Sequence, residues 1–190
     1  MLDWIRNYLD LQKRSLDSID HGAVVELAGV LRDAHAAGRM IFACGNGASA
    51  ANSSHFACDL GKNGSAAMPA PFRVLSLNDN TPWMTAIGND FAYEDVYWRQ
   101  LSNYAQAGDV LVGISVSGNS PNVVKALEWA REHKMRTVAI IGGHRGKAGD
   151  IAELSIVVDD RHFGRAEDAH MTILHMAVFA FMEGVVPPRS

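Results

Sequence analysis

The chain has 190 residues, of which 48% are hydrophobic and 20% are charged, which suits one globular domain with a sizeable core. Its formal net charge is −4 and no run of like charges interrupts the sequence, whereas a nucleic-acid partner would require a basic stripe. The N-terminus lacks the basic start and apolar stretch of a signal peptide, and the longest apolar run, Met171–Met182, is too short to span a bilayer. We therefore expect a cytoplasmic protein that binds neither nucleic acid nor membrane.

The two cysteines, Cys44 and Cys58, do not have the C-x-x-C spacing of a metal site. We expect both to be small buried side chains in a reducing compartment.

In chain order, two helical stretches are predicted before the first strand, with a break near His21-Gly22. Five short apolar runs of strand length follow, and most are rich in Val and Ile. Segments with helical spacing lie between these runs, so the strands alternate with helices, as in a parallel sheet covered on both faces. We predict a three-layer, doubly wound α/β domain of the flavodoxin type, with additional N-terminal helices. Its five parallel strands are expected at Arg39–Ala43, Arg73–Leu77, Asp109–Ser115, Thr137–Ile141 and Ser155–Val158.

Two of the predicted strands run into loops of the same chemistry, F-A-C-G-N-G-A-S-A and G-I-S-V-S-G-N-S-P-N, and a helix follows each loop. Small residues let the backbone approach an anion, serine hydroxyls donate hydrogen bonds, and a helix start presents free N–H groups. Because ligands of doubly wound sheets bind outside the carboxyl ends of the strands, the two loops together predict a site for a phosphorylated small molecule.

A dinucleotide site is the alternative for the first loop, because Gly45-x-Gly47-x-x-Ala50 formally fits G-x-G-x-x-G/A. That fingerprint also requires an acidic residue about 20 residues further on. The nearest candidate, Asp79, comes more than 30 residues after Gly45, and the second serine loop has no role in a dinucleotide site.

The loops and their surroundings resemble the sugar-isomerase (SIS) domain, and in particular the bacterial phosphoheptose isomerase family. The matching segments are G-N-G-A-S-A at Gly45–Ala50, S-H-F at Ser54–Phe56, T-A-I-G-N-D at Thr85–Asp90, the run Gly108–Leu127 and E-D-A-H-M-T-I-L-H at Glu167–His175. The resemblance covers nearly the whole chain. We therefore expect residues 1–190 to form a single SIS domain with a helical extension over about residues 1–37. The family implies a homotetramer with active sites between subunits.

The resemblance also implies the site. Serines of both loops hold the sugar phosphate in the family, and Asp90 is a candidate contact for sugar hydroxyls. The substrate and phosphate residues expected here are Asn46, Gly47, Ser49, Asp90, Ser115, Ser117, Asn119 and Ser120. Zinc is the implied cofactor, held by His55, Asp59, Glu167 and His175.

Three positions depart from the family pattern. Val116 replaces a threonine of the second loop, Asp59 replaces a glutamate, and Glu167 replaces a glutamine. The first change removes a hydroxyl donor. The last turns an amide into an acid, which should strengthen metal binding and weaken attraction for an anionic sugar.

Spacing alone places His55 and Asp59 on one helix face, one turn apart, where they could bind a metal or transfer a proton. Glu167 and His175 are eight residues apart, about 12 Å along a straight helix. Either the helix begins after Glu167, or different copies of the chain contribute these two residues. The helix over Met171–Met182 is apolar nearly all round, so we expect it to be buried against another copy of the chain, with burial inside one subunit as the alternative. His170 is an alternative to His175 that matches the family less well.

The implied reaction is ketose–aldose isomerisation of a phosphosugar through a cis-enediol, with sedoheptulose 7-phosphate and glycero-manno-heptose 7-phosphate as the expected pair. We assign Asp59 as base and His175 as acid, and Glu167 is the alternative base. Two other functions stay open. One is isomerisation of a different phosphosugar. The other is a non-catalytic SIS-domain binding protein, related to the type that associates with the bacterial replication initiator.

Overall fold

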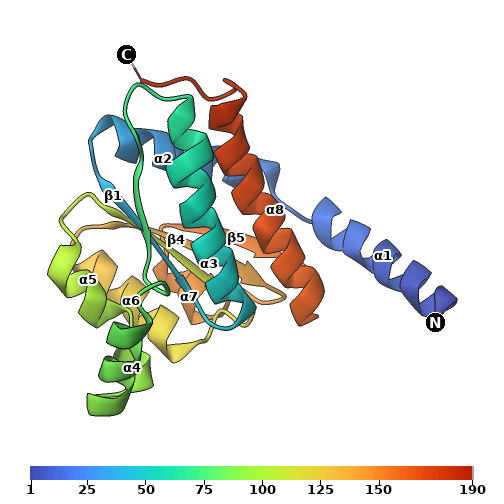
Figure 1. Ribbon diagram of the computed structural model, residues 1–190. Helices are drawn as coiled ribbons and strands as arrows, with labels where there is room; N and C mark the ends of the chain where they lie inside the picture. Colours follow the sequence, from blue (N-terminus) through green and yellow to red (C-terminus); the bar gives the residue numbers. More distant parts are fainter. Residues whose placement is uncertain (190) are drawn as a thin grey trace.

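The computed structural model describes residues 1–189 and confirms the predicted architecture, a five-stranded parallel sheet with helices on both faces (Figure 1). The strand order β2-β1-β3-β4-β5 is that of a doubly wound flavodoxin-type sheet. All five predicted strands are present, to within two residues at each end. They are β1 (Met40–Gly45), β2 (Arg73–Ser76), β3 (Val110–Ser115), β4 (Arg136–Gly142) and β5 (Leu154–Val158).

Eight α-helices and two short irregular helices connect these strands within the described residues. On one face lie α2 (His21–Ala36), α3 (Ala48–Asp59) and α8 (Phe163–Met182), and on the other lie α6 (Pro121–Glu132) and α7 (Gly146–Ile151). The remaining elements are α1 (Leu2–Asp17), the π-helix η1 (Leu60–Gly64), α4 (Thr81–Asp90), the 3₁₀-helix η2 (Tyr93–Asp95) and α5 (Trp98–Tyr104).

The strands read as continuous apolar runs because each side of the sheet has its own core. In β1, Ile41 and Ala43 join the core under α2, α3 and α8, whereas Phe42 and Cys44 join the core under α6. A strand alternates its side chains between the two faces, so a strand covered on both faces is apolar at every position.

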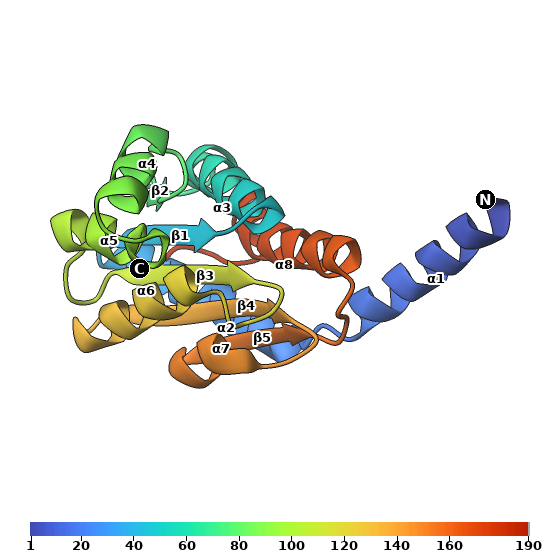
Figure 2. The same ribbon diagram turned by 90° about the horizontal axis from the view of Figure 1, so that it is seen from below.

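The break between the first two helices lies at residues 18–20, next to the predicted His21-Gly22. The Asp20 carboxylate accepts hydrogen bonds from the N–H groups of Gly22 (2.8 Å) and Ala23 (3.2 Å) and so caps α2. Figure 2 shows α1 extending away from the sheet and its helices. Large apolar side chains of α1 are therefore exposed, namely Leu2, Trp4, Ile5 and Leu9.

One expectation needs correction. Cys44 is buried as predicted, but Cys58 is exposed because it lies on the outer side of α3. Within one chain the late helix is only partly buried, since Met176 and Met182 remain 40% and 47% exposed on α8, and its burial against another copy stays a prediction. Within residues 1–189, no helix combines the length and the apolar character needed to cross a membrane.

Candidate active site

The first anion loop joins β1 to α3 through Gly45, Asn46 and Gly47. Gly47 has a φ of +57°, in the left-handed region that favours glycine. A Cβ on Gly45 would lie 2.7 Å from the Cβ of Ser49, so only glycine allows the strand to end this close to the helix. Gly47 is the N-cap of α3 and offers no side-chain cap. The Ser49 and Ala50 N–H groups donate to the carbonyls of Asn46 and Gly47 at 3.0 Å each, so this helix start attracts an anion chiefly through the positive end of its dipole.

The second loop joins β3 to α6. Ser120 is the N-cap of α6 and Pro121 is its first helical residue. The Ser120 hydroxyl makes no cap bond to its own helix and instead lies 3.0 Å from the Ser115 hydroxyl, which is 3.5 Å from that of Ser117. Three hydroxyl groups therefore gather at a helix N-terminus, where each can donate to an anion.

The two loops enclose a cavity of about 120 Å³, which we call the loop cavity. Six of the predicted site residues line it. These are Asn46, Ser49, Ser115, Ser117, Ser120 and Glu167, together with Ile114, Val116 and Phe163. The structure thus brings the serines of the two loops, separated by more than 60 residues of sequence, to one point at the carboxyl edge of the sheet.

Three predicted substrate residues do not line the loop cavity. The Asn119 amide donates to the Ser117 carbonyl (2.9 Å) and accepts from the Lys147 N–H (3.1 Å), so it holds the second loop against α7. Gly47 lines a neighbouring cavity of about 490 Å³ together with Thr81 and Tyr93. Asp90 is exposed at the end of α4 and lines neither cavity.

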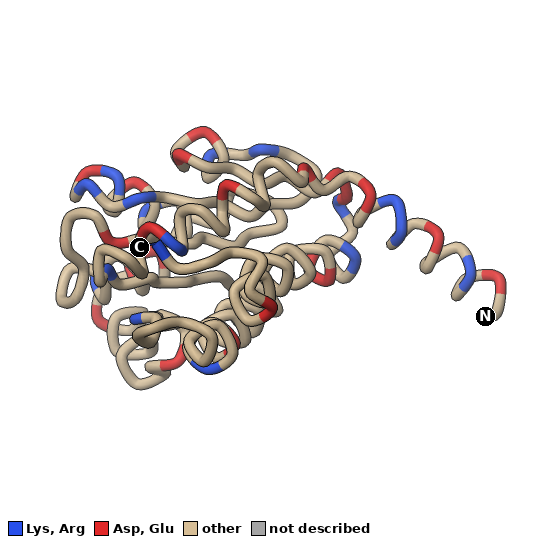
Figure 3. The backbone as a smooth tube through the Cα atoms, turned by 90° about the horizontal axis from the view of Figure 1, so that it is seen from above, with Lys and Arg blue, Asp and Glu red and all other residues tan. Residues whose placement is uncertain are grey.

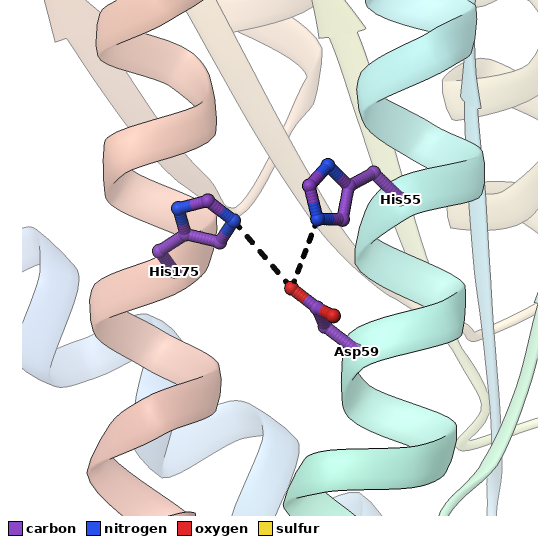
Figure 4. A group of neighbouring side chains, drawn as sticks. All are labelled: His55, Asp59 and His175. Atoms are coloured by element: carbon purple, nitrogen blue, oxygen red, sulfur yellow. Dashed lines mark ion pairs between the residues drawn. The ribbon is translucent and has the colours of Figure 1, made fainter.

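A cluster of metal-ligand type lies further along α3, where that helix meets α8 (Figure 4). The Asp59 Oδ2 atom is 3.2 Å from His55 Nε2 and 3.5 Å from His175 Nε2. One ligand atom from each residue lies within 4.8 Å of the other two. The Asp59 side chain is 13% exposed, and those of His55 and His175 are 51% and 39% exposed. The cluster therefore opens outward, where a further ligand could approach.

Asn63 supports this cluster and was not assigned from the sequence. Its amide donates to Asp59 Oδ1 at 3.2 Å, which leaves Oδ2 directed toward the two imidazoles. Asn63 lies in η1, the π-helical turn that directly follows α3, and such turns are frequent at functional sites. Asn63 comes four residues after Asp59, and this spacing could have indicated that the two lie on one helix face, as it did for His55 and Asp59.

Glu167 is not part of this cluster in the described chain. Because α8 begins at Phe163, the possibility that the helix starts after Glu167 is wrong, and Glu167 lies in the loop cavity instead. Burial is the main cause that raises the pKa of Glu167, and the negative charge of the nearby Asp168 carboxylate raises this pKa further. The backbone carbonyl of Glu167 accepts from the Asn52 amide at 3.0 Å, which ties α8 to α3 beside the cavity.

His170 points into the protein. It is fully buried, and neither ring nitrogen has a hydrogen-bond partner among residues 1–189. It cannot reach a ligand in the cluster, which agrees with the choice of His175.

The fold and the two serine loops define a phosphosugar-binding domain of the SIS type, and the sequence model of the SIS domain family matches residues 3–142. Phosphoheptose isomerases are among the similar proteins. That of Geobacter sp. (strain M21) is 41% identical over 81% of this chain and 80% of its own length. That of Geobacter sulfurreducens is 36% identical over 93% of this chain and 94% of its own length.

A solved structure gives the same result. The structure of phosphoheptose isomerase GmhA from Neisseria gonorrhoeae superposes with a TM-score of 0.87 at 28% identity, over 96% of this chain and 98% of that one. The chain therefore belongs to the SIS domain family, among its phosphoheptose isomerases.

Proposed function

We propose that the protein is an isomerase that interconverts sedoheptulose 7-phosphate and glycero-manno-heptose 7-phosphate through a cis-enediol. The cluster of His55, Asp59 and His175 near the loop cavity is the observation that carries this proposal. Ser49 and His55 are six residues apart on α3, which corresponds to about 9 Å. A sugar phosphate with its phosphate in the loop cavity would extend along α3 to bring its reactive carbons to the cluster.

The chain supplies groups for each proton transfer. We assign the Asp59 carboxylate to remove the proton from C1 of the ketose while the C2 carbonyl oxygen gains a proton, which gives the enediol. A proton then returns to C2 and the O1 hydroxyl loses its proton, which gives the aldose. His175, whose Nε2 lies 3.5 Å from Asp59 Oδ2, is the acid we assign to protonate O2 and C2. If Nε2 binds a metal, the proton that His175 can donate is the one on Nδ1.

The cluster suits zinc. Two imidazole nitrogens and one carboxylate oxygen are a typical catalytic zinc set with one position left open. When bound, the ion would polarise the substrate carbonyl and stabilise the charge of the enediolate. With neutral imidazoles and one carboxylate the loaded cluster carries a net charge of +1, which suits an anionic intermediate. Glu167 of the same chain could become a further metal ligand only if the side chains or the subunits rearrange.

We further propose a cytoplasmic homotetramer with sites between subunits. The exposed apolar side chains of α1 and of the outer side of α8 support self-association, because contiguous apolar surface usually marks an interface. Asp90 lines neither the loop cavity nor its neighbour, which supports a site that needs a second copy. Free Cys44 and Cys58 suit a reducing compartment. Light-scattering mass determination tests the tetramer, which a clean monomer would contradict.

Isomerisation of another phosphosugar is the alternative, and the changes at Val116, Asp59 and Glu167 are its support. A non-catalytic binding role is less well supported, since such a protein has no need for three converging ligand and acid–base groups.

The deciding experiment incubates the purified protein with sedoheptulose 7-phosphate in heavy water and follows deuterium at C1 and C2 by NMR. We expect incorporation, because enediol formation exposes the removed proton to solvent. A pentose and a hexose ketose phosphate serve as comparison substrates. Absence of incorporation with every sugar would rule out enediol chemistry. Metal analysis of the same sample should find about one zinc per site.

A further inference from the structure

The two anion loops are joined by a reciprocal pair of amide hydrogen bonds. Asn46 Nδ2 donates to Asn122 Oδ1 at 2.8 Å, and Asn122 Nδ2 donates to Asn46 Oδ1 at 2.8 Å. Asn46 belongs to the first loop, and Asn122 is the second residue of α6, directly after the second loop. This amide pair is a direct bridge between two segments 76 residues apart in the sequence.

The first loop is held at this point from several sides. Asn46 Oδ1 also accepts a hydrogen bond from the Tyr93 hydroxyl (3.1 Å) and lies 3.2 Å from the Tyr97 hydroxyl oxygen. The single Tyr97 hydroxyl proton is donated to the Gly45 carbonyl, which is the shorter contact, and the Asn78 amide donates to the same carbonyl at 2.9 Å. The position of Asn46 is therefore set by surrounding groups before any ligand arrives.

Ser49 follows Asn46 closely. The Ser49 N–H donates to the Asn46 carbonyl at 3.0 Å, and the Ser49 Cβ is the atom that a Cβ on Gly45 would meet at 2.7 Å. A shift of Asn46 relative to α6 would therefore move the Ser49 hydroxyl relative to Ser115, Ser117 and Ser120.

Asn122 itself does not reach the ligand space. It is 1% exposed and lines neither the loop cavity nor its neighbour. Its Oδ1 accepts from Asn46 and from the Val123 N–H (3.0 Å), and one of its two amide protons goes to Asn46. Any influence of Asn122 on a bound anion must therefore pass through Asn46.

We propose that Asn122 is a positioning residue for phosphate binding, which aligns Ser49 of the first loop with the serines of the second loop through its amide pair with Asn46. This inference rests on one part of the proposed function, the binding of the phosphate in the loop cavity. It does not depend on the isomerisation chemistry.

A double-mutant cycle tests the alignment. The variants are Asn122→Ala, Ser49→Ala and the two combined, and the probe is inorganic phosphate, with its Kd measured by calorimetry. We expect Asn122→Ala to raise the Kd about tenfold, because small displacements of binding groups have large effects. We expect Ser49→Ala to raise it about tenfold in the native background. In the Asn122→Ala background Ser49 is already displaced, so there we expect Ser49→Ala to raise the Kd less than about threefold.

A purely structural role would give a different pattern. If Asn122 contributed only to stability, the two changes would be additive, and additivity would overturn the proposal. An unchanged Kd in folded Asn122→Ala protein would overturn it too, as would a native chain that does not bind phosphate. The matched control is Asn103→Ala, which removes an exposed amide bonded to the Arg99 carbonyl on α5 and should leave the Kd unchanged.

Circular dichroism and a thermal melt establish that each variant is folded. Asn122→Ser is the second variant, because a serine still offers a polar group to the Val123 N–H but is too short for the reciprocal pair. If both variants fail to fold, Asn122 is needed for folding and the proposal is wrong. The KM for sedoheptulose 7-phosphate should rise in parallel with the Kd while kcat changes little. Coupled phosphate binding without isomerase activity would leave the inference intact and remove the proposed function.

Discussion

Asp59 is the residue on which the candidate site converges. Its Oδ2 atom faces both imidazoles, and its Oδ1 atom is held by the Asn63 amide. Asp59 is one methylene shorter than the glutamate typical of the family, and it nevertheless reaches His175 on the neighbouring helix. The short side chain is therefore compatible with a three-residue metal site.

We predict that Asp59→Asn lowers kcat by about a hundredfold or more and removes most of the bound metal. The substitution keeps the shape but removes both the base and the anionic ligand. Deuterium exchange and metal analysis measure the two effects. Asp150→Asn is the control, because Asp150 is an exposed acid of α7. An active, metal-loaded Asp59→Asn protein would remove Asp59 from the mechanism.

Glu167 brings a carboxylate into the loop cavity, where a phosphate is expected. Figure 3 shows Lys and Arg interspersed with Asp and Glu along the chain, and among the described residues no Lys or Arg lines this cavity. Phosphate attraction must therefore come from the serines and the helix N-termini, and an ionised Glu167 opposes it.

We predict that Glu167→Gln lowers the KM for the phosphosugar severalfold and leaves kcat within about threefold, since it removes a repulsive charge. Steady-state kinetics measure both constants. Glu183→Gln, an exposed acid just after α8, is the matched control. If kcat collapses in Glu167→Gln while KM does not fall, Glu167 is the base and the assignment to Asp59 is wrong.

At the scale of secondary-structure elements, α3 and α8 form the frame of the site. Ser49 and the cluster residues His55 and Asp59 lie along α3, and Glu167 and His175 lie along α8. The two helices start at the carboxyl edge of the sheet and lie side by side (Figure 1). Each helix therefore contributes residues near its start to the loop cavity and residues further along to the metal cluster.

His170 on α8 is fully buried, which favours its neutral form. Burial lowers its pKa from 6.5 to about 4. Because the folded-state pKa lies below the unfolded one, the unfolded chain binds the proton more tightly. Stability is thus fully present above pH 6.5 and is lost as the pH falls toward 4.

We predict that protonation of His170 alone lowers the free energy of unfolding by about 3 kcal/mol between pH 7.5 and pH 4. Urea unfolding across this range measures the loss. His170→Leu should remove this part of the pH dependence, whereas His133→Leu, on the exposed end of α6, should retain it. Equal pH slopes in the native protein and His170→Leu would contradict the prediction.

At the scale of the whole molecule, a single chain leaves two features without a partner. Helix α1 extends away from the sheet (Figure 2) and its large apolar side chains are exposed, although the end of α1 is bonded to the segment that leads into α8. Ser15 donates to the Asp160 carboxylate, which forms an ion pair with Arg165 on α8 (2.6 Å). Asp90 is likewise exposed and lines neither the loop cavity nor its neighbour. A second copy would account for both features.

We predict that Asp90→Asn and His175→Gln, each inactive alone, regain activity when the two variants are unfolded, mixed and refolded together. If Asp90 serves the site of a neighbouring subunit, about a quarter of the sites in mixed oligomers contain both native residues. The regained rate is measured against each variant refolded alone. No regain in verified mixed oligomers would place Asp90 and His175 in one chain's site.

Much of this molecule follows from local sequence. The five strands, the break before α2, the two serine loops and the pair His55 and Asp59 were predicted, because strand burial, turn chemistry and helix periodicity each depend on neighbouring residues. The position of Asn63 could have been found by the same four-residue spacing. Glu167 and His175 could be named from a family motif but not placed, since their surroundings are other elements.

By itself, the sequence determined the doubly wound fold, the order of the elements and the residue types of the site. Only the tertiary structure decided which of these residues meet. It separated Glu167 from the metal cluster, directed Asn119 away from the loop cavity, and joined Asn46 to Asn122 across 76 residues. The physical reason is that local periodicity is encoded within a few residues, whereas contacts between distant segments depend on how helices and strands pack.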